Sequence, residues 1–426
     1  MARTFDKRPI MRMKILSILV LVLTLACIAE HADTETTGES AATLTLFSPP
    51  IPAVSFDGGF EIHGVDANRQ FWFAAVPSAV GAQHVGVIVA DRWTGERVGM
   101  LPPPVSGFGA VMAVRVDGGD RLAVLDAVVD PAHAGFAPAV LYEYAIATHR
   151  PFSATLLSTH TLPLIPISEI PSAFSPEPRT ALSGIFYPLA FTIADTSAGR
   201  IAIITDAVGG AIWIQTLGGS SVATLALMDP RLRPAPHAPI LGRGRATASS
   251  TRDYTFSIPG VFPGVFGIAA HHSGQVVFSV PAQGGIWKLS IDQLLSSSSF
   301  ATKGAAIRPL ITVGTTPDLV AAIDADRFDA DRFVYFQRTA ADASTSFQNV
   351  LYRASIDGGA AEPIAKSNLV YDWSVSISVV PALLPHTIVI ASAMGQEQNN
   401  ADVNASLGGT STFVAPTLIG AVLGIR

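Results

Sequence analysis

The segment from Gly260 to Asp292 carries a compact β pattern that constrains the fold of the whole chain. Apolar or alternating residues predict strands over 266–270, 275–280 and 286–291. Turns are predicted between them, over 272–274 and 283–285. Glycines stand in both turns, and β-branched and aromatic residues fill the strands. Such a meander buries one face only against a neighbour like itself, so it predicts a repeat protein.

The same pattern occurs six times along the chain. The second strands of the six copies start near Phe71, Leu122, Ile201, Val276, Phe333 and Ile388. These starts lie roughly 50 to 80 residues apart, somewhat more than the spacing of typical propeller blades. We therefore predict an all-β fold, a six-bladed β-propeller in which each blade is a four-stranded antiparallel meander. One propeller would occupy 46–426, with irregular insertions at about 148–182 and 228–257.

The first 29 residues predict a secretory signal peptide. Lys7, Arg8 and Lys14 precede an apolar run over 15–26, which is too short for a spanning helix. Cleavage after Ala29 would leave 30–45 as a flexible leader. Lipid attachment at Cys27, the only cysteine, is the alternative. We expect a secreted or extracellular protein, or a periplasmic one if the source is bacterial.

The composition of the chain limits the kinds of partner that we expect it to bind. Hydrophobic residues make up 49% and charged residues 14%, so the chain can bury a large core. A net charge of −6 gives no reason to expect nucleic acid, and no segment predicts a membrane span. A small-molecule ligand is the expected partner, and the oligomeric state stays open. Asn404 is a glycosylation acceptor if the source is eukaryotic.

The chain has no standard catalytic signature. The G-x-S-x-G elbow, H-E-x-x-H, the P-loop and paired cysteines are all missing, and we assign no catalytic residue. His271 and His272 are adjacent at a turn, which favours a solvated turn over a metal pair. The acidic run of Asp324, Asp326, Asp329 and Asp331 also predicts a solvated turn, because the glycine and glutamate of a calcium loop are absent.

Several predicted strand pairs carry short motifs: Gly264-Val-Phe-Gly-Ile-Ala, Gly274-Gln-Val-Val-Phe-Ser-Val-Pro, Ala202-Ile-Ile-Thr-Asp, Thr316-Pro-Asp-Leu and Tyr371-Asp-Trp-Ser. These motifs resemble those of the yellow / major royal jelly protein family. The resemblance runs from about Gly59 to about Ala393. It implies an exported six-bladed propeller that binds a small aromatic or amine-bearing ligand at the channel mouth. The chain departs from the family in lacking its cysteines and in having Tyr187-Pro188 in place of Asn-Asp.

The gluconolactonase / senescence marker protein family is the more distant resemblance. It implies a lactonase or hydrolase with one divalent cation, calcium or zinc, held by a Glu, two Asn and an Asp. Glu61 and Asp318 match the acidic ligands. Tyr187 or Pro188 and Phe266 stand where the asparagines should be, and neither side chain suits a hard cation. Our main interpretation therefore has no cofactor, and a structural or interaction propeller is a further alternative.

The starts of the six inner strands should meet at the predicted channel mouth. The side chains expected there include Glu61, Tyr187, Phe266, Asp318 and Trp373. Aromatic faces and carboxylates together suit a flat cationic or phenolic molecule. The alternative is that the three aromatic residues fill the channel as core.

Overall fold

The computed structural model describes five well-formed blades and parts of the segments that join them. The described residues are 45–46, 54–55, 64–76, 86–94, 96–126, 129–130, 135–136, 138–166, 184–185, 188–206, 209–219, 221–233, 235–236, 261–262, 264–313, 319–325, 331–340, 347–367, 373–380, 387–394 and 417–424. The predicted signal peptide, most of the predicted leader, and Asn404 lie outside them.

Five sheets are four-stranded antiparallel meanders, which we call blades 1 to 5. Blade 1 holds β3 (Gly64–Ala67), β4 (Phe71–Val76), β5 (Gly86–Asp91) and β6 (Arg97–Met100). Blade 2 holds β7 (Val111–Asp117), β8 (Arg121–Asp126), β11 (Val140–Ile146) and β12 (Ala154–Thr161). Blade 3 holds β15 (Pro188–Thr196), β16 (Gly199–Asp206), β17 (Ala211–Thr216) and β18 (Thr224–Met228). Blade 4 holds β21 (Ile268–His271), β22 (Gln275–Val280), β23 (Gly285–Ser290) and β24 (Arg308–Thr312). Blade 5 holds β25 (Leu319–Ala325), β26 (Arg332–Ala340), β27 (Phe347–Ser355) and β28 (Glu362–Ser367).

The last sheet is built differently, which corrects the predicted blade count. Its long strands are β29 (Trp373–Val380), β30 (Thr387–Met394) and β31 (Thr417–Gly424). No further C-terminal strand follows β31 in the part of the chain described; instead β31 pairs with β1 (Thr45–Leu46) and β2 (Val54–Ser55) from the N-terminal side. The prediction of six four-stranded meanders is therefore wrong, because the structure has five such blades. The copy that starts near Ile388 supplies only part of a sheet.

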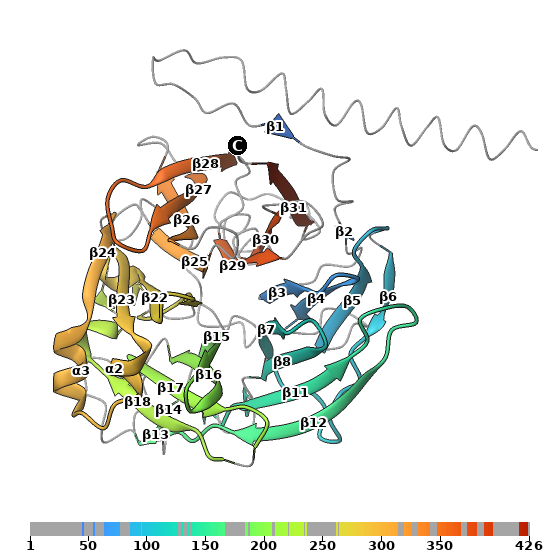
Figure 1. The fold of residues 1–426 in the computed structure, drawn as a ribbon, viewed down its shortest axis with the longest axis horizontal. Coiled ribbons are helices and arrows are strands. Elements are labelled where there is room, and N and C mark those ends of the chain that lie inside the picture. Colours follow the sequence, from blue (N-terminus) through green and yellow to red (C-terminus); the bar gives the residue numbers. More distant parts are fainter. Residues whose placement is uncertain are drawn as a thin grey trace, which may run out of the picture. The chain divides into compact units, whose positions relative to one another are not determined.

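The first strand of each blade packs against the first strand of the next (Figure 1). β3 contacts β7, β7 contacts β15, β15 contacts β21, and β21 contacts β25. β25 contacts β29, and β29 contacts β3. These contacts make a closed ring of inner strands, as in a β-propeller.

The hydrophobic core lies between the blades. Each cluster of buried apolar side chains in the described residues joins two consecutive blades: 1 with 2, 2 with 3, 3 with 4, and 4 with 5. Phe73, Phe191 and Phe278 are fully buried in these clusters. The blades are apolar on both faces because each is covered on both sides, which explains the high hydrophobic fraction of the sequence.

The predicted strands of the Gly260–Asp292 segment are confirmed. β22 covers Gln275–Val280, and the turn before it contains Gly274 with a φ of 76°. Left-handed backbone of this kind favours glycine, so the turn residue and the alternating pattern specify the hairpin together.

The connecting segments contain short elements. Three two-stranded sheets pair β9 (Val129–Asp130) with β10 (Gly135–Phe136), β13 (Ile165–Pro166) with β14 (Gly184–Ile185), and β19 (Ala235–Pro236) with β20 (Val261–Phe262). The helical elements among the described residues are η4 (Pro230–Leu232), η5 (Pro281–Gln283), α2 (Ile291–Leu295) and α3 (Phe300–Ala306). β12 lies within 148–182, which the sequence predicts to be irregular; this outer strand is mostly exposed, and its exposed residues include Leu156 and Leu157. No helix among the described residues is long and apolar enough to cross a membrane.

Asp91 at the end of β5 gives a testable pH effect. Its carboxylate accepts hydrogen bonds from the Thr94 N–H at 2.8 Å, Gln70 Nε2 at 2.6 Å and Arg150 Nε at 2.8 Å. Burial raises the pKa of Asp91, but these hydrogen bonds outweigh burial and lower the pKa from 3.8 to about 2. The carboxylate is therefore more acidic in the folded chain than in the unfolded chain.

We expect Asp91→Asn to lower the free energy of unfolding by about 1–2 kcal/mol at neutral pH, since Arg150 is half exposed and its contribution is screened. A lowered folded-state pKa stabilises the protein above pH 3.8, and this stabilisation is lost as the pH falls toward 2. Urea unfolding of both proteins across this pH range measures the difference. If the difference in the free energy of unfolding between the two proteins stayed constant down to pH 2, the lowered pKa of Asp91 would be contradicted.

Candidate functional site

A cavity of about 500 Å³ lies where the inner strands of blades 2 to 5 end. It is lined by Arg115, Val116, Asp117, Gly118, Thr192, Ile193, Asp195, Ala270, His272, Asp324 and Ala325. These residues come from the second halves of β7, β15, β21 and β25 and from the turns that follow. Because every blade starts with its inner strand, the carboxyl ends of these strands gather at one end of the ring. The lining is rich in charged and polar side chains, which suits a polar ligand.

Polar side chains tie the inner strands together beside the cavity. Neighbouring inner strands do not form a β-ladder, so their backbone N–H groups need other acceptors. Three side chains on alternate strands supply them: Asp66 Oδ2 accepts from Val116 N at 2.8 Å, Thr192 Oγ1 from Ala270 N at 3.0 Å, and Asp324 Oδ2 from Val379 N at 2.7 Å. The acceptors are buried. These bonds hold the cavity wall in a fixed arrangement.

The guanidinium group of Arg115 places a positive charge in the cavity wall. Its Nε donates to the Phe191 carbonyl at 3.1 Å, and its Nη1 lies 3.9 Å from Asp324 Oδ2. Both side chains are about nine-tenths buried, at 10% and 6% exposure. A buried charge needs a partner or hydrogen bonds, so Arg115 and Asp324 compensate one another across the ring.

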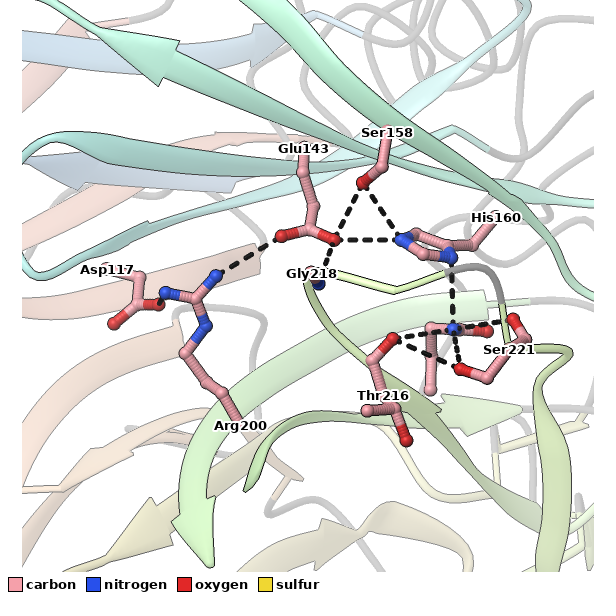
Figure 2. A network of polar contacts seen from close by, with 9 residues as sticks. Asp117, Glu143, Ser158, His160, Arg200, Thr216, Gly218 and Ser221 are labelled. Atoms are coloured by element: carbon pink, nitrogen blue, oxygen red, sulfur yellow. Dashed lines mark hydrogen bonds and ion pairs between the residues drawn. The ribbon is translucent and has the colours of Figure 1, made fainter. Parts of the chain in front are cut away.

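Asp117 forms an ion pair with Arg200 (Figure 2). Arg200 Nη1 lies 2.6 Å from Asp117 Oδ2, and Arg200 Nη2 donates to Glu143 Oε2 at 3.2 Å. Arg200 is on β16, whereas the two carboxylates are on β7 and β11. The guanidinium therefore bridges blades 2 and 3 next to the cavity.

Glu143 is the most heavily bonded side chain of this network. Its Oε1 accepts from the Gly218 N–H, from Ser158 Oγ and from His160 Nε2, each at 2.8 Å. Burial raises the pKa of Glu143, but these hydrogen bonds outweigh burial and lower it. Glu143 is therefore ionised and available to hold Arg200.

His160 is fixed in one tautomer by its neighbours. Gln215 Nε2 lies 2.8 Å from the Thr216 carbonyl and 3.0 Å from the Ser221 carbonyl, so this atom is the donating amide nitrogen. It also donates to His160 Nδ1 at 3.0 Å, which assigns the proton of the neutral ring to Nε2.

The Ser158, His160 and Glu143 cluster is not a nucleophilic triad. In a triad the imidazole accepts the serine proton at one nitrogen and binds the acid at the other. Here Ser158 Oγ and Glu143 Oε1 both face Nε2, at 3.0 and 2.8 Å. The serine proton points to the carboxylate, so the cluster joins blades 2 and 3 and does not activate Ser158.

Asp195 and His272 are the side chains best placed to meet a ligand. Both line the cavity and are exposed. Within the described residues, Asp195 has no side-chain hydrogen bond or ion pair, and His272 only stacks on His271, with ring centroids 4.2 Å apart. A ligand can therefore bind a free carboxylate and a free imidazole without displacing a protein partner.

Little of the site predicted from sequence falls within the described residues. Glu61, Tyr187 and Asp318 lie outside the described residues. Phe266 is buried, 3% exposed, among core residues, and Trp373 begins β29, with its side chain outside the described part. The channel-mouth site therefore stays a prediction, and Phe266, the one member whose side chain is described, is buried.

Two turns predicted to be solvated contribute to the cavity instead. Asp324 is buried in β25 and lines the cavity, while Asp331 is exposed in a turn, and the two aspartates between them lie outside the described residues. His272 is exposed as predicted, but His271 is buried, and its Nε2 lies 3.1 Å from the Arg332 carbonyl. Closure of the ring places these residues, and no local pattern signals it.

A metal site is not formed by the described part of the chain. No group of three His, Cys, Asp or Glu residues there could hold an ion. Glu61 and Asp318, the predicted ligands, fall outside this part.

No family model matches the chain, and no curated protein matches it, so the resemblance to the yellow / major royal jelly proteins stays a prediction. Similar solved structures are propellers of several kinds. The periplasmic gluconolactonase of Pseudomonas aeruginosa is 8% identical, with 85% of each chain covered and a TM-score of 0.42. Virginiamycin B lyase of Staphylococcus aureus is 10% identical, covering 82% of this chain and 97% of the lyase, with a TM-score of 0.39.

The β-propeller domain of Cps50 (Swd1) from Myceliophteria thermophila is 9% identical. It covers 83% of this chain and 97% of that domain, with a TM-score of 0.38. Similarities this low carry no information on the activity or ligand of this chain.

Proposed function

We propose that this propeller binds a small polar molecule, rich in hydroxyl groups, in the cavity at the carboxyl ends of its inner strands. The observation that carries the proposal is the pair of unpartnered side chains, Asp195 and His272, in a cavity whose other charges are compensated. A carboxylate accepts hydrogen bonds from hydroxyl or amine groups, and a neutral imidazole both donates and accepts.

The charge of the lining defines the ligand further. The cavity-lining residues include the carboxylates of Asp117, Asp195 and Asp324 and the guanidinium of Arg115. Arg200 offsets Asp117 and Arg115 offsets Asp324, so Asp195 carries the excess negative charge. Polyols and amine-bearing sugars fit this balance better than strongly anionic molecules. Apart from the imidazole of His272, no ring lines the cavity within the described residues, which gives an aromatic ligand no stacking surface there.

Hydrolysis of a lactone is the second candidate, and the exposed imidazole of His272 favours it. The imidazole would take a proton from a water molecule as the water oxygen attacks the lactone carbonyl carbon. The C–O bond between the carbonyl carbon and the ring oxygen of the lactone would then break. The proton would pass from His272 to that leaving oxygen. The described residues do not provide a metal site, so we assign no step to a cation.

Calorimetric titration with polyols, amino sugars, sugar acids and sugar lactones tests the proposal. We expect at least one hydroxyl-rich compound to bind, and Asp195→Asn or His272→Ala to weaken its binding about tenfold or more, the size of a hydrogen bond to a charged group. Asp292→Asn, which removes an exposed carboxylate on α2, is the matched control and should change the dissociation constant less than twofold.

The same proteins separate the two candidates. Turnover of a lactone that His272→Ala abolishes, with binding of polyols retained, would support hydrolysis. Binding without turnover would leave a binding protein. If no compound binds, or if Asp195→Asn binds as tightly as the unmodified protein, the cavity is not the ligand site.

A further inference from the structure

We propose that Arg200 sets the charge preference of the cavity although it does not line it. Its guanidinium stands between Asp117, which is in the cavity wall, and Glu143, which is buried behind the wall. The effect on ligand choice rests on the proposed function, whereas the effect on the electrostatic potential of the cavity does not.

The geometry assigns one guanidinium nitrogen to each carboxylate. Nη1 faces Asp117 at 2.6 Å and Nη2 faces Glu143 at 3.2 Å. The Arg200 side chain is 24% exposed and that of Asp117 is 19% exposed, so solvent only partly screens the pair. A planar guanidinium held at both ends has little freedom to turn away from Asp117.

Glu143 holds one end of the Arg200 guanidinium in a fixed position. Its Oε1 is occupied by three donors, and this leaves Oε2 for Arg200. The side chain of Glu143 is only 4% exposed. The buried cluster of Ser158, His160 and Gln215 therefore acts on the cavity through Arg200, which explains why so many polar groups are buried between blades 2 and 3.

Loss of Arg200 would remove one positive charge from beside the Asp117 carboxylate in the cavity wall. The cavity would then favour cations and repel anions more strongly than it does with Arg200 in place. This change can be measured with a cysteine at Ala270, which lines the cavity and is half-buried. Cys27, the natural cysteine, is replaced by serine in all variants.

The experiment compares the rates at which a trimethylammonium-bearing and a sulfonate-bearing methanethiosulfonate modify Ala270→Cys. In each case the thiolate forms a mixed disulfide and a sulfinate leaves. Arg200→Gln should raise the ratio of the cationic to the anionic rate about three- to tenfold, the effect of one unit charge nearby at the protein surface. Arg200→Lys, which keeps the charge, should restore most of the original ratio.

Arg97→Gln is the matched control, since Arg97 is an exposed residue on β6, the outermost strand of blade 1. It should change the ratio less than twofold. If Arg200→Gln does not fold, Asp117→Asn provides the opposite test, because it removes a negative charge from the cavity wall while Arg200 stays, which should lower the ratio by a similar factor. A ratio that neither variant changes would overturn the proposal.

The outcome is distinct from that of the binding experiments. If the ratio shifts as expected but no polyol, amino sugar, sugar acid or lactone binds, the role of Arg200 stands and the proposed function fails. If a ligand binds and the ratio does not shift, the proposed function stands and the role of Arg200 fails.

Discussion

Replacing Asp66 by alanine is expected to lower the free energy of unfolding by about 3–5 kcal/mol, the range for a broken buried charged network. Asp66 on β3 is 0% exposed. It accepts hydrogen bonds from Ser378 Oγ at 2.6 Å, from the Val116 N–H at 2.8 Å and from the Ala67 N–H at 2.8 Å. Alanine would leave three buried donors without this acceptor, and each such loss is destabilising.

The location of Asp66 explains why we expect so large an effect. Its partners lie on β7 of blade 2 and on β29 of the C-terminal sheet, and Ser378 on β29 is 312 positions from Asp66 in the sequence. Urea unfolding measures the change. Asp292→Ala on α2, an exposed site, should shift the free energy of unfolding by no more than about 0.5 kcal/mol. An equally small effect of Asp66→Ala would show that the hydrogen bonds of Asp66 to β7 and β29 do not stabilise the ring.

Gly64→Ala is expected to destabilise the protein by about 2–3 kcal/mol, toward the upper end of the range for overpacked cores. A Cβ at Gly64 would stand 2.7 Å from the Ala113 Cα and 3.0 Å from the Val114 nitrogen. Both are backbone atoms of β7, so they cannot move aside as a flexible side chain would. Blades 1 and 2 would have to separate at the centre of the ring.

Gly219→Ala is the matched control for this prediction. A Cβ at Gly219 meets no atom within 4 Å, and its φ is not in the left-handed region. Its unfolding midpoint in urea should match that of the unmodified protein. If Gly64→Ala and Gly219→Ala behaved alike, the close approach of β3 and β7 would not exist in solution.

Local patterns predicted the blades well but not their number. The strand over 275–280 follows from alternation and from Gly274, which are properties of adjacent residues. The last sheet depends on the pairing of Thr45 with Gly424 and of Val54 with Leu418. β1 and β2 have two residues each, which is too few to show a periodic pattern. Counting repeats along the sequence therefore gave six meanders, whereas the structure has five.

The site was harder to predict than the fold. Asp117 and His272 stand at or beyond strand ends, where charged residues usually indicate solvated turns. Only closure of the ring shows that the ends of β7, β15, β21 and β25 surround one cavity. Phe266 shows a different difficulty, because an aromatic residue at a strand start is compatible in sequence with a ligand site and with a packed core, and the structure buries it.

The measurement that tests the central claim most directly is hydrogen–deuterium exchange of the unmodified protein with and without the tightest-binding compound of the titration series. The account predicts slower exchange of backbone amides in 115–118, 192–196 and 270–274, which surround the cavity. Protection confined to the opposite ends of the same strands, around 109–111 and 264–268, would contradict it. That result would place the ligand at the mouth first predicted from the sequence.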